Sequence, residues 1–155
     1  ILNDSVGGVT VTVPIDGMEK KDPAFVKGAT LTLQGDQAEA FVRYRDIGED
    51  YSAIYRMDRQ KQYITGFFKS IKQQSRKNSA IVTDIFDSIQ DHMVTDMGKE
   101  EYLKVAMDAL GGGDLTDQDI YTVPGESRTT DLYDEFYADP DGLTVQILEM
   151  FYREI

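Results

Sequence analysis

Residues 9–13 alternate valine with threonine, which is the period of a half-buried β-strand of β-branched residues. A proline follows the run and ends it. A second short strand is predicted over residues 29–33, followed by a glycine turn and a helix whose expected N-cap is Asp36. The beginning of the chain is therefore predicted to be two strands and a helix.

Apolar residues then recur at the spacing of amphipathic helices, which predicts helices over residues 54–74, 81–93 and 95–110. Gly66 lies in the middle of the first of these helices. Glycine costs roughly 1 kcal/mol relative to alanine at such a position, so it marks either close packing or space for a ligand, and close packing is the expectation here.

The last part of the chain alternates strand and turn signals. Strands are predicted over residues 120–123 and 132–137, and a Pro-Gly turn follows the first of them. Asp139 is the expected N-cap of a last helix. The apolar residues of that helix are expected to face the core: Leu143, Ile147, Leu148 and Phe151. Together the elements predict an α/β fold with a mixed sheet covered by helices, as a single domain over residues 1–155.

Composition narrows the classes of function. The chain has 155 residues, enough for one domain with a core, and its net charge of -12 argues against a nucleic-acid partner. The absence of cysteine excludes disulfides and thiolate metal sites. Residues 99–155 hold 14 acidic and 4 basic side chains, whereas residues 43–77 hold 9 of the 16 lysines and arginines. The positive charge is therefore concentrated in one segment.

That segment contains four arginines close together, Arg43, Arg45, Arg56 and Arg59. Two arginines on alternate residues at a helix end can flank one ligand, and Arg56, Arg59 and Gln60 share a helical face beside an apolar stripe. Guanidinium groups are planar, permanently charged donors that match phosphate oxygens. A pyrophosphate with a hydrocarbon tail suits such a surface.

A structural role for the arginines is an alternative, because four acidic residues are close enough in sequence to pair with them: Asp46, Glu49, Asp50 and Asp58. Other sites have little support. His92 is the only histidine and is expected to be a surface or capping residue. The glycines at 111–113 lack the features of a phosphate-binding loop and are interpreted as a linker.

Several motifs in a fixed order resemble the LytR-CpsA-Psr (LCP) family. They are a Gly-Gly-Val strand, a Leu-x-Gly-x-x-Ala helix start, an Arg-x-Arg pair and an Arg-x-x-Arg-Gln helix, found at residues 6–11, 33–38, 41–45 and 56–60. Residues 121–126 and 151–152 also resemble the end of such domains. The resemblance covers most of the chain.

This resemblance implies a three-layer α-β-α domain with a lipid tail between sheet and helices. It also implies a cell-envelope phosphotransferase at the extracellular face of the cell membrane or wall of a Gram-positive bacterium. The reaction would move a teichoic-acid-like or capsular glycopolymer from a polyprenyl pyrophosphate carrier to a peptidoglycan acceptor, with Mg²⁺ assisting. The alternative is a non-catalytic module that binds polyprenyl phosphate or an anionic glycan.

The family's motifs also assign residue roles. The residues expected to be catalytic are Arg43, Arg45 and Arg56. Those expected to bind substrate are Arg59, Gln60 and Asp50. The family often has an aspartate three residues before the arginine that matches Arg56, where this chain has Ala53, and Asp50 is the candidate to replace it.

The resemblance corresponds to the C-terminal portion of the family's domain. The strands that precede it in the family carry further aspartates and an arginine for the metal and the phosphate. We therefore expect the main Mg²⁺ ligands and a membrane anchor to lie outside this chain, and this chain alone to bind ligand at best.

Overall fold

A computed structural model describes residues 1–46, 48, 52–130 and 134–152 of the chain. The sequence predicts one domain over residues 1–155. In the structure, contacts within the chain divide it into two compact units, Ile1–Asp117 and Gln118–Ile155.

The first unit contains the strand pair that the sequence predicts. Strand β1 (Val9–Thr12) pairs antiparallel with β2 (Thr30–Leu33). The valines of β1 point into the core and its threonines point outward, as the alternation requires. On the exposed face the threonine hydroxyls of the two strands pair: Thr10 with Thr32 at 2.9 Å and Thr12 with Thr30 at 3.0 Å.

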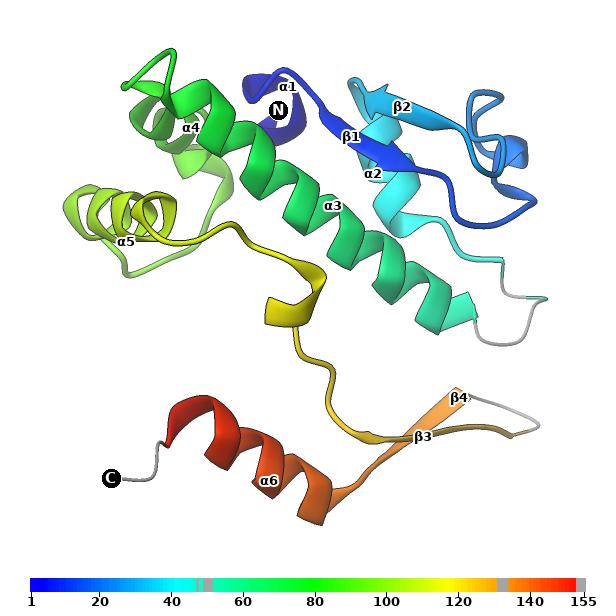
Figure 1. Ribbon diagram of the computed structural model, residues 1–155. Helices are drawn as coiled ribbons and strands as arrows, with labels where there is room; N and C mark the ends of the chain where they lie inside the picture. Colours follow the sequence, from blue (N-terminus) through cyan, green and yellow to red (C-terminus); the bar gives the residue numbers. More distant parts are fainter. Residues whose placement is uncertain (47, 49–51, 131–133, 153–155) are drawn as a thin grey trace. The chain divides into compact units, whose positions relative to one another are not determined.

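Helices make up most of this unit. The α-helices are α1 (Leu2–Ser5), α2 (Asp36–Arg43), α3 (Ser52–Ser75), α4 (Ile81–Ile89) and α5 (Lys99–Gly111). Short 3₁₀ turns are η1 (Met18–Lys20), η2 (Gln90–His92) and η3 (Asp117–Asp119), the last at the boundary of the two units. Helix α3 contacts β1, α2 and α4, and α4 contacts α1 and α5 (Figure 1). The long helix therefore connects the strand pair to the later helices.

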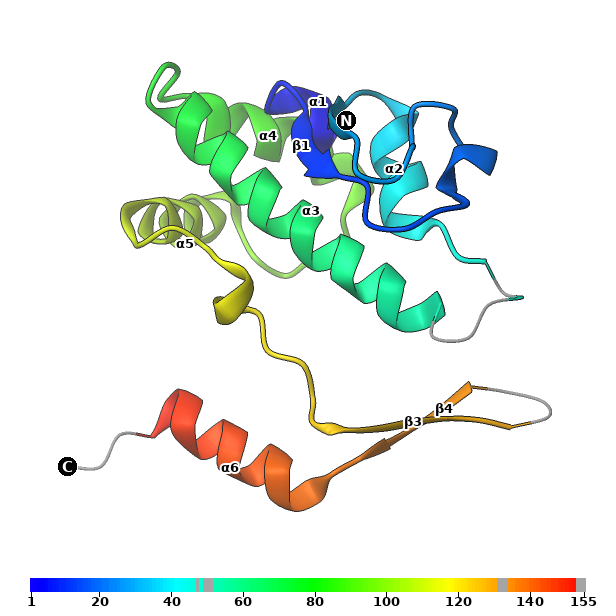
Figure 2. The same ribbon diagram turned by 45° about the vertical axis from the view of Figure 1, so that its right-hand side comes forward.

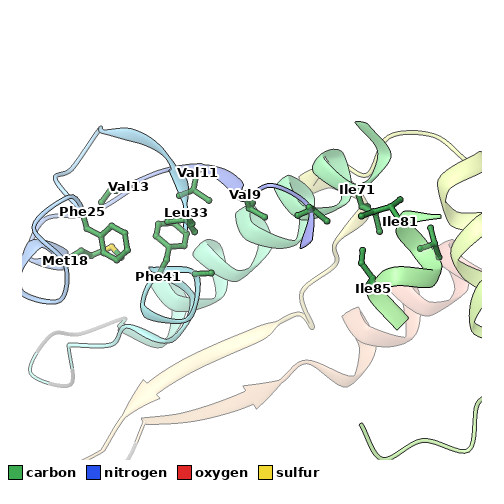
Figure 3. Close-up of a cluster of buried hydrophobic side chains, with 13 residues drawn as sticks. Val9, Val11, Val13, Met18, Phe25, Leu33, Phe41, Ile71, Ile81 and Ile85 are labelled. Atoms are coloured by element: carbon green, nitrogen blue, oxygen red, sulfur yellow. The ribbon is translucent and has the colours of Figure 1, made fainter. Parts of the chain in front are cut away.

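The core of the first unit gathers side chains from nearly all of these elements. Its buried hydrophobic residues are Val6, Val9, Val11, Val13, Met18, Phe25, Leu33, Ala38, Phe41, Ile71, Ile81, Val82 and Ile85. Figure 3 shows Phe41 of α2 beside Leu33 and the valines of β1, while Ile81 and Ile85 of α4 lie beside Ile71 of α3.

Gly66 of α3 packs closely against β1, as its place in the sequence predicts. A Cβ at this position would lie 2.7 Å from Val9 Cγ1 and 3.3 Å from the carbonyl oxygen of Thr10. The side chain of Gln62, one turn earlier, accepts a hydrogen bond from the backbone N–H of Thr12 at 3.0 Å. The missing side chain is therefore what allows helix and strand to touch.

Two predicted helix starts were wrong by a few residues. Helix α2 has Gly35 as its N-cap, at φ 50°, and Asp36 is its first residue. Helix α5 begins at Lys99, after Gly98, whose N–H donates to Glu101 Oε2 at 3.0 Å. In both cases a glycine takes the non-helical conformation of the cap, and the acidic residue stabilises the first turn instead.

The second unit is a hairpin followed by a helix. Strand β3 (Gly125–Thr129) pairs antiparallel with β4 (Asp134–Ala138), and α6 (Pro140–Phe151) follows directly (Figure 2). Asp139 caps α6 as predicted, since its Oδ1 accepts from the N–H of Asp141 at 3.1 Å. The strand predicted over residues 120–123 was wrong, because pairing begins only at Gly125, where a turn was expected.

The predicted core face of α6 was also wrong. Ile147, Leu148 and Phe151 are exposed by 42%, 49% and 72%. No side chain of the second unit is buried among its described residues. The period of the sequence gave the helix correctly, but burial depends on a facing element that period alone does not supply.

The α/β class is confirmed. The strands that the structure describes form two separate two-stranded antiparallel sheets, and helices account for most of the ordered backbone.

Candidate functional site

Arg43 is the last residue of α2, and the helix is anchored so that this residue reaches solvent. Ala38 and Phe41 face the core, which turns Glu39 and Arg43 outward one helical turn apart. Arg43 Nη1 lies 2.6 Å from Glu39 Oε1, and the arginine side chain is 75% exposed. The guanidinium is therefore held by one weak surface ion pair.

Arg45 lies two residues further along, beyond the helix end. Its Nε donates to Ser52 Oγ, 3.0 Å away at the start of α3. Arg43 and Arg45 both line an open groove of about 900 Å³, together with Lys21 from the loop after η1. The groove also carries carboxylates, namely those of Asp22, Asp36 and Glu39. The predicted arginine pair therefore shares one surface.

Arg56 lies on the first turns of α3 and is half-buried. Its Nε atom is buried and has no hydrogen-bond partner among the described residues. An unsatisfied buried donor costs about 1–3 kcal/mol, which is unusual in a folded protein. The Arg56 guanidinium therefore carries a donor that no described group satisfies.

Arg59, one turn later, is buried, with only 1% of its surface exposed. Its Nε donates to the carbonyl oxygen of Phe41 at 2.9 Å, and its Nη2 donates to the carbonyl oxygen of Tyr44. Burial lowers the pKa of Arg59, and the neighbouring charge of Arg56 acts in the same direction. Its Nη1 is buried and has no partner in the part of the chain that the structure describes.

Gln60 also faces α2. Its Nε2 donates to the carbonyl oxygen of Val42 at 3.3 Å. The structure thus places the two substrate-binding candidates Arg59 and Gln60 against the backbone at the end of α2. The third candidate, Asp50, lies outside the described residues.

Of the acidic residues considered as partners of the arginines, Asp46 pairs with a lysine, whereas Glu49 and Asp50 lie outside the described residues. Arg43 pairs with Glu39, one turn before it on the same helix. Asp46 lies 3.5 Å from the Nζ atom of Lys20, in another loop. Ala53, at the position of the family's aspartate, is half-buried in the first turn of α3. None of these contacts involves Arg56, whose Nε has no acceptor among the described residues.

Sequence reasoning missed three residues of this region. Lys21 is far from the arginines in sequence and reaches the groove only through the fold. Tyr44 lies between the two arginines, and its hydroxyl donates to the carbonyl oxygen of Gly17 at 2.9 Å. Ser52 is 5% exposed and was recognisable only as a small polar residue near a helix start.

The described residues do not fit a magnesium centre. Within residues 1–46, 48, 52–130 and 134–152, no three or more acidic, histidine or cysteine residues gather in a way that could hold a metal ion. His92 is exposed in η2. In the same ranges no helix is sufficiently long and apolar to span a membrane.

The arrangement is suited to binding an anion. Arg43 and Arg45 line an open groove, and Arg59 is bound to the backbone at the end of α2. Arg56 carries an unsatisfied buried donor but is not among the described residues that line the groove. Such guanidinium groups can bind phosphate oxygens through two parallel hydrogen bonds.

Solved structures with a similar fold come from several bacteria. This chain has 23% sequence identity to B. subtilis TagV, with a TM-score of 0.68. The match covers 99% of this chain and 60% of the TagV chain. For the Lin1025 protein from Listeria innocua the identity is 26% and the TM-score 0.58, over 97% of this chain and 60% of that one. For gbs0355 from Streptococcus agalactiae the identity is 21% and the TM-score is 0.66, over 99% of this chain and 54% of that one.

The chain therefore spans about 60% of the length of the first two of these structures. A comparison with curated proteins gives no match. The model of the LytR_cpsA_psr family matches residues 1–148, nearly the whole chain. The chain belongs to the LytR-CpsA-Psr family, a family of cell-wall glycopolymer transferases associated with the cell envelope.

Proposed function

We propose that this chain supplies the diphosphate-binding part of an enzyme that transfers a glycopolymer from a polyprenyl pyrophosphate carrier to peptidoglycan. Family membership supports the class of reaction. The observations that carry the proposal for this chain are that Arg43 and Arg45 line one open groove where α2 ends, and that the buried Nε of Arg56 on α3 lacks an acceptor among the described residues.

Arg43 and Arg45 would bind the outer phosphate oxygens from the groove. The ion pair of Arg43 with Glu39 is exposed, and such pairs contribute only about 0.2–1 kcal/mol. Exchanging the carboxylate of Glu39 for a phosphate therefore costs little. In the free chain one carboxylate accepts a hydrogen bond from one guanidinium group. In the complex the doubly charged diphosphate would accept hydrogen bonds from two guanidinium groups.

Arg56 would act on charge that develops as the bond to the carrier breaks. A fixed guanidinium stabilises such charge without reorganising, and electrostatic stabilisation of this kind is usually the largest contribution to catalysis. The orphaned Nε of Arg56 would gain the acceptor that it lacks among the described residues.

The remaining features of the reaction are proposed for the whole protein. They are dependence on Mg²⁺, a glycan linked to polyprenyl pyrophosphate as donor, peptidoglycan as acceptor, and a location on the outer face of a Gram-positive cell membrane. The described residues do not fit a magnesium centre, and the roles proposed for Arg43, Arg45 and Arg56 do not depend on the metal.

The direct test is calorimetric titration of the purified chain with geranylgeranyl pyrophosphate, with and without magnesium. We expect saturable binding that weakens by about tenfold or more in an Arg43→Ala, Arg45→Ala double variant, because charge-assisted hydrogen bonds are lost. Geranylgeraniol, which has the tail but no phosphate, should bind much more weakly.

A matched control removes two positive charges beyond the C-terminal end of α3. Arg76→Ala with Lys77→Ala alters two exposed residues just beyond α3 and should leave binding within about twofold. Equal losses in both double variants would indicate non-specific attraction, and no binding by the unaltered chain would contradict the proposed site. Binding by a longer, magnesium-supplied protein without transfer would favour the non-catalytic binding module.

A further inference from the structure

The C-terminal end of α2 is capped by side chains from a different helix. A helix end leaves its last carbonyl groups without partners, and a glycine in the left-handed conformation often supplies the missing hydrogen bonds. Tyr44 follows α2 instead, at φ −52° and ψ 133°, and its N–H bonds only to Ala40. The carbonyl oxygens of Phe41, Val42 and Tyr44 therefore need other donors.

Two successive residues of α3 provide these donors. Arg59 serves the carbonyl oxygens of Phe41 and Tyr44, and Gln60 serves that of Val42. The guanidinium carbon of Arg59 also lies 5.6 Å from the centre of the Tyr44 ring, within cation–π distance. One buried side chain thus holds both the carbonyl group and the ring of the residue that separates Arg43 from Arg45.

We infer that Arg59 is a positioning residue: it fixes Tyr44 and thereby directs the two flanking arginines, without itself contacting the anion. This inference rests on the proposed diphosphate site. Because Arg43 and Arg45 are adjacent to Tyr44 on either side, rotation of the Tyr44 backbone would turn both guanidinium groups away from a shared ligand. Arg59 therefore acts on ligand binding through Tyr44.

The surroundings of Arg59 support this role over direct contact. Its Nε and Nη2 atoms are already committed to carbonyl oxygens. The cavity that it lines with Tyr44, Arg45 and Ser52 has a volume of about 10 Å³. That space is the size of a single water molecule, so a diphosphate cannot enter it. A water in this cavity could serve Nη1.

The first test compares two substitutions that differ in charge. Arg59→Lys keeps the charge but replaces the planar fork, whose Nε and Nη2 atoms reach two different carbonyl groups, with a single nitrogen, and Arg59→Met removes both the charge and the donors. We expect both variants to speed hydrogen–deuterium exchange of the Tyr44 and Arg45 amides by about tenfold, and both to weaken binding of geranylgeranyl pyrophosphate by about tenfold.

The control is Val82→Ala, which destabilises the core near α4 without touching α2. At temperatures where every variant is folded, Val82→Ala should bind geranylgeranyl pyrophosphate as the unaltered chain does. Its amide hydrogens at residues 44–45 should also exchange at the rate of the unaltered chain. Wild-type binding by Arg59→Lys together with loss in Arg59→Met would show a direct charge contact and overturn the inference. Unchanged exchange at residues 44–45 in both variants would also overturn it, whether or not the chain binds the probe.

A measurement on the unaltered chain covers the case in which the Arg59 variants do not fold. The arginine Nε–H resonances are followed during titration with geranylgeranyl pyrophosphate. Those of Arg43 and Arg45 should shift, whereas the buried resonance of Arg59 should exchange slowly with solvent and remain in place. A shift of Arg59 as large as those of Arg43 and Arg45 would contradict a positioning role. If no resonance shifts, the proposed diphosphate site is wrong. In that case slow exchange of the Arg59 Nε–H proton would still support its hold on Tyr44, and fast exchange would contradict it.

Discussion

The two units of the chain use similar sequence patterns with different results. In Ile1–Asp117, amphipathic strands and helices bury one another around a shared core. In Gln118–Ile155, an amphipathic hairpin and helix form, but none of the described side chains becomes buried. The comparison separates what a local pattern determines, which is secondary structure, from what requires a facing partner, which is a core.

The largest expected effect comes from removing a buried aromatic ring of the first unit. Phe25 is fully buried, and its ring centre lies 5.8 Å from that of Phe41 in an edge-to-face arrangement. Phe25→Ala should lower the free energy of unfolding by about 3–5 kcal/mol, because it leaves a cavity. Guanidinium denaturation followed by circular dichroism measures the change.

The matched variant lies in the second unit. Phe136 of β4 is 51% exposed, so Phe136→Ala should change stability by no more than about 0.5 kcal/mol. If both variants lost equal stability, the contrast between the units would be wrong, because the face of β4 would then be covered in solution.

A smaller effect is expected where α3 meets β1. Gly66→Ala would force a methyl group against Val9 and should cost about 1–3 kcal/mol, although alanine favours the helix itself by about 1 kcal/mol. Gly111→Ala in α5 is the control, since no atom lies within 4 Å of its Cβ position. Thermal unfolding of the two variants should move in opposite directions. A stabilised Gly66→Ala would show that α3 is looser on β1 than the structure indicates.

Within the second unit, α6 should depend mainly on its own end signals. Asp139→Ala removes the N-cap hydrogen bond to Asp141 and should cost about 1 kcal/mol of local helix stability. Hydrogen exchange should quicken in α6 and stay constant in α1 to α5. Asp139→Ser, which keeps an acceptor oxygen, should restore most of the protection, and failure of this rescue would point to another source of stability.

The smallest expected effect is a dependence on pH in the first unit. The pKa of Asp4 is lowered from 3.8 by hydrogen bonds, first from the Asn3 side chain and then from the Gly35 N–H. A lowered pKa stabilises the folded state above the ordinary value, and this contribution disappears as pH falls through the folded value.

Urea denaturation from about pH 7 to about pH 2 tests this dependence against Asp4→Asn, which cannot titrate. The difference in unfolding free energy between the two proteins should be constant above pH 3.8, and it should shrink as the pH falls below that value. A constant difference throughout would mean that Asp4 has the same pKa in the folded and unfolded chain.

The sequence was sufficient for most elements of the first unit. The alternation at residues 9–13 and the helical spacing of later apolar residues placed β1, α3 and α4. Gly66 predicted close packing, although the sequence did not say that β1 is the neighbour. The start of α5 was misplaced because Gly98 accommodates the cap conformation without a capping side chain.

The candidate site was predictable only in part. The motifs identified the arginines, but not that Arg59 and Gln60 face the end of α2, because that contact joins residues 15 to 18 positions apart. Lys21 reaches the groove from still further away in sequence. Spacing along one helix says which residues share a face, while the element opposite that face is set by the tertiary fold.

The contact of Arg59 with α2 differs from that of Arg43 with Glu39 in how it responds to the solvent. Salt screens an exposed ion pair. The oxygens that accept from Arg59 are peptide carbonyls in a buried site, which carry no titrating proton and are shielded from ions. At high ionic strength, the outer arginine should therefore lose its partner while the junction of α2 and α3 keeps its geometry.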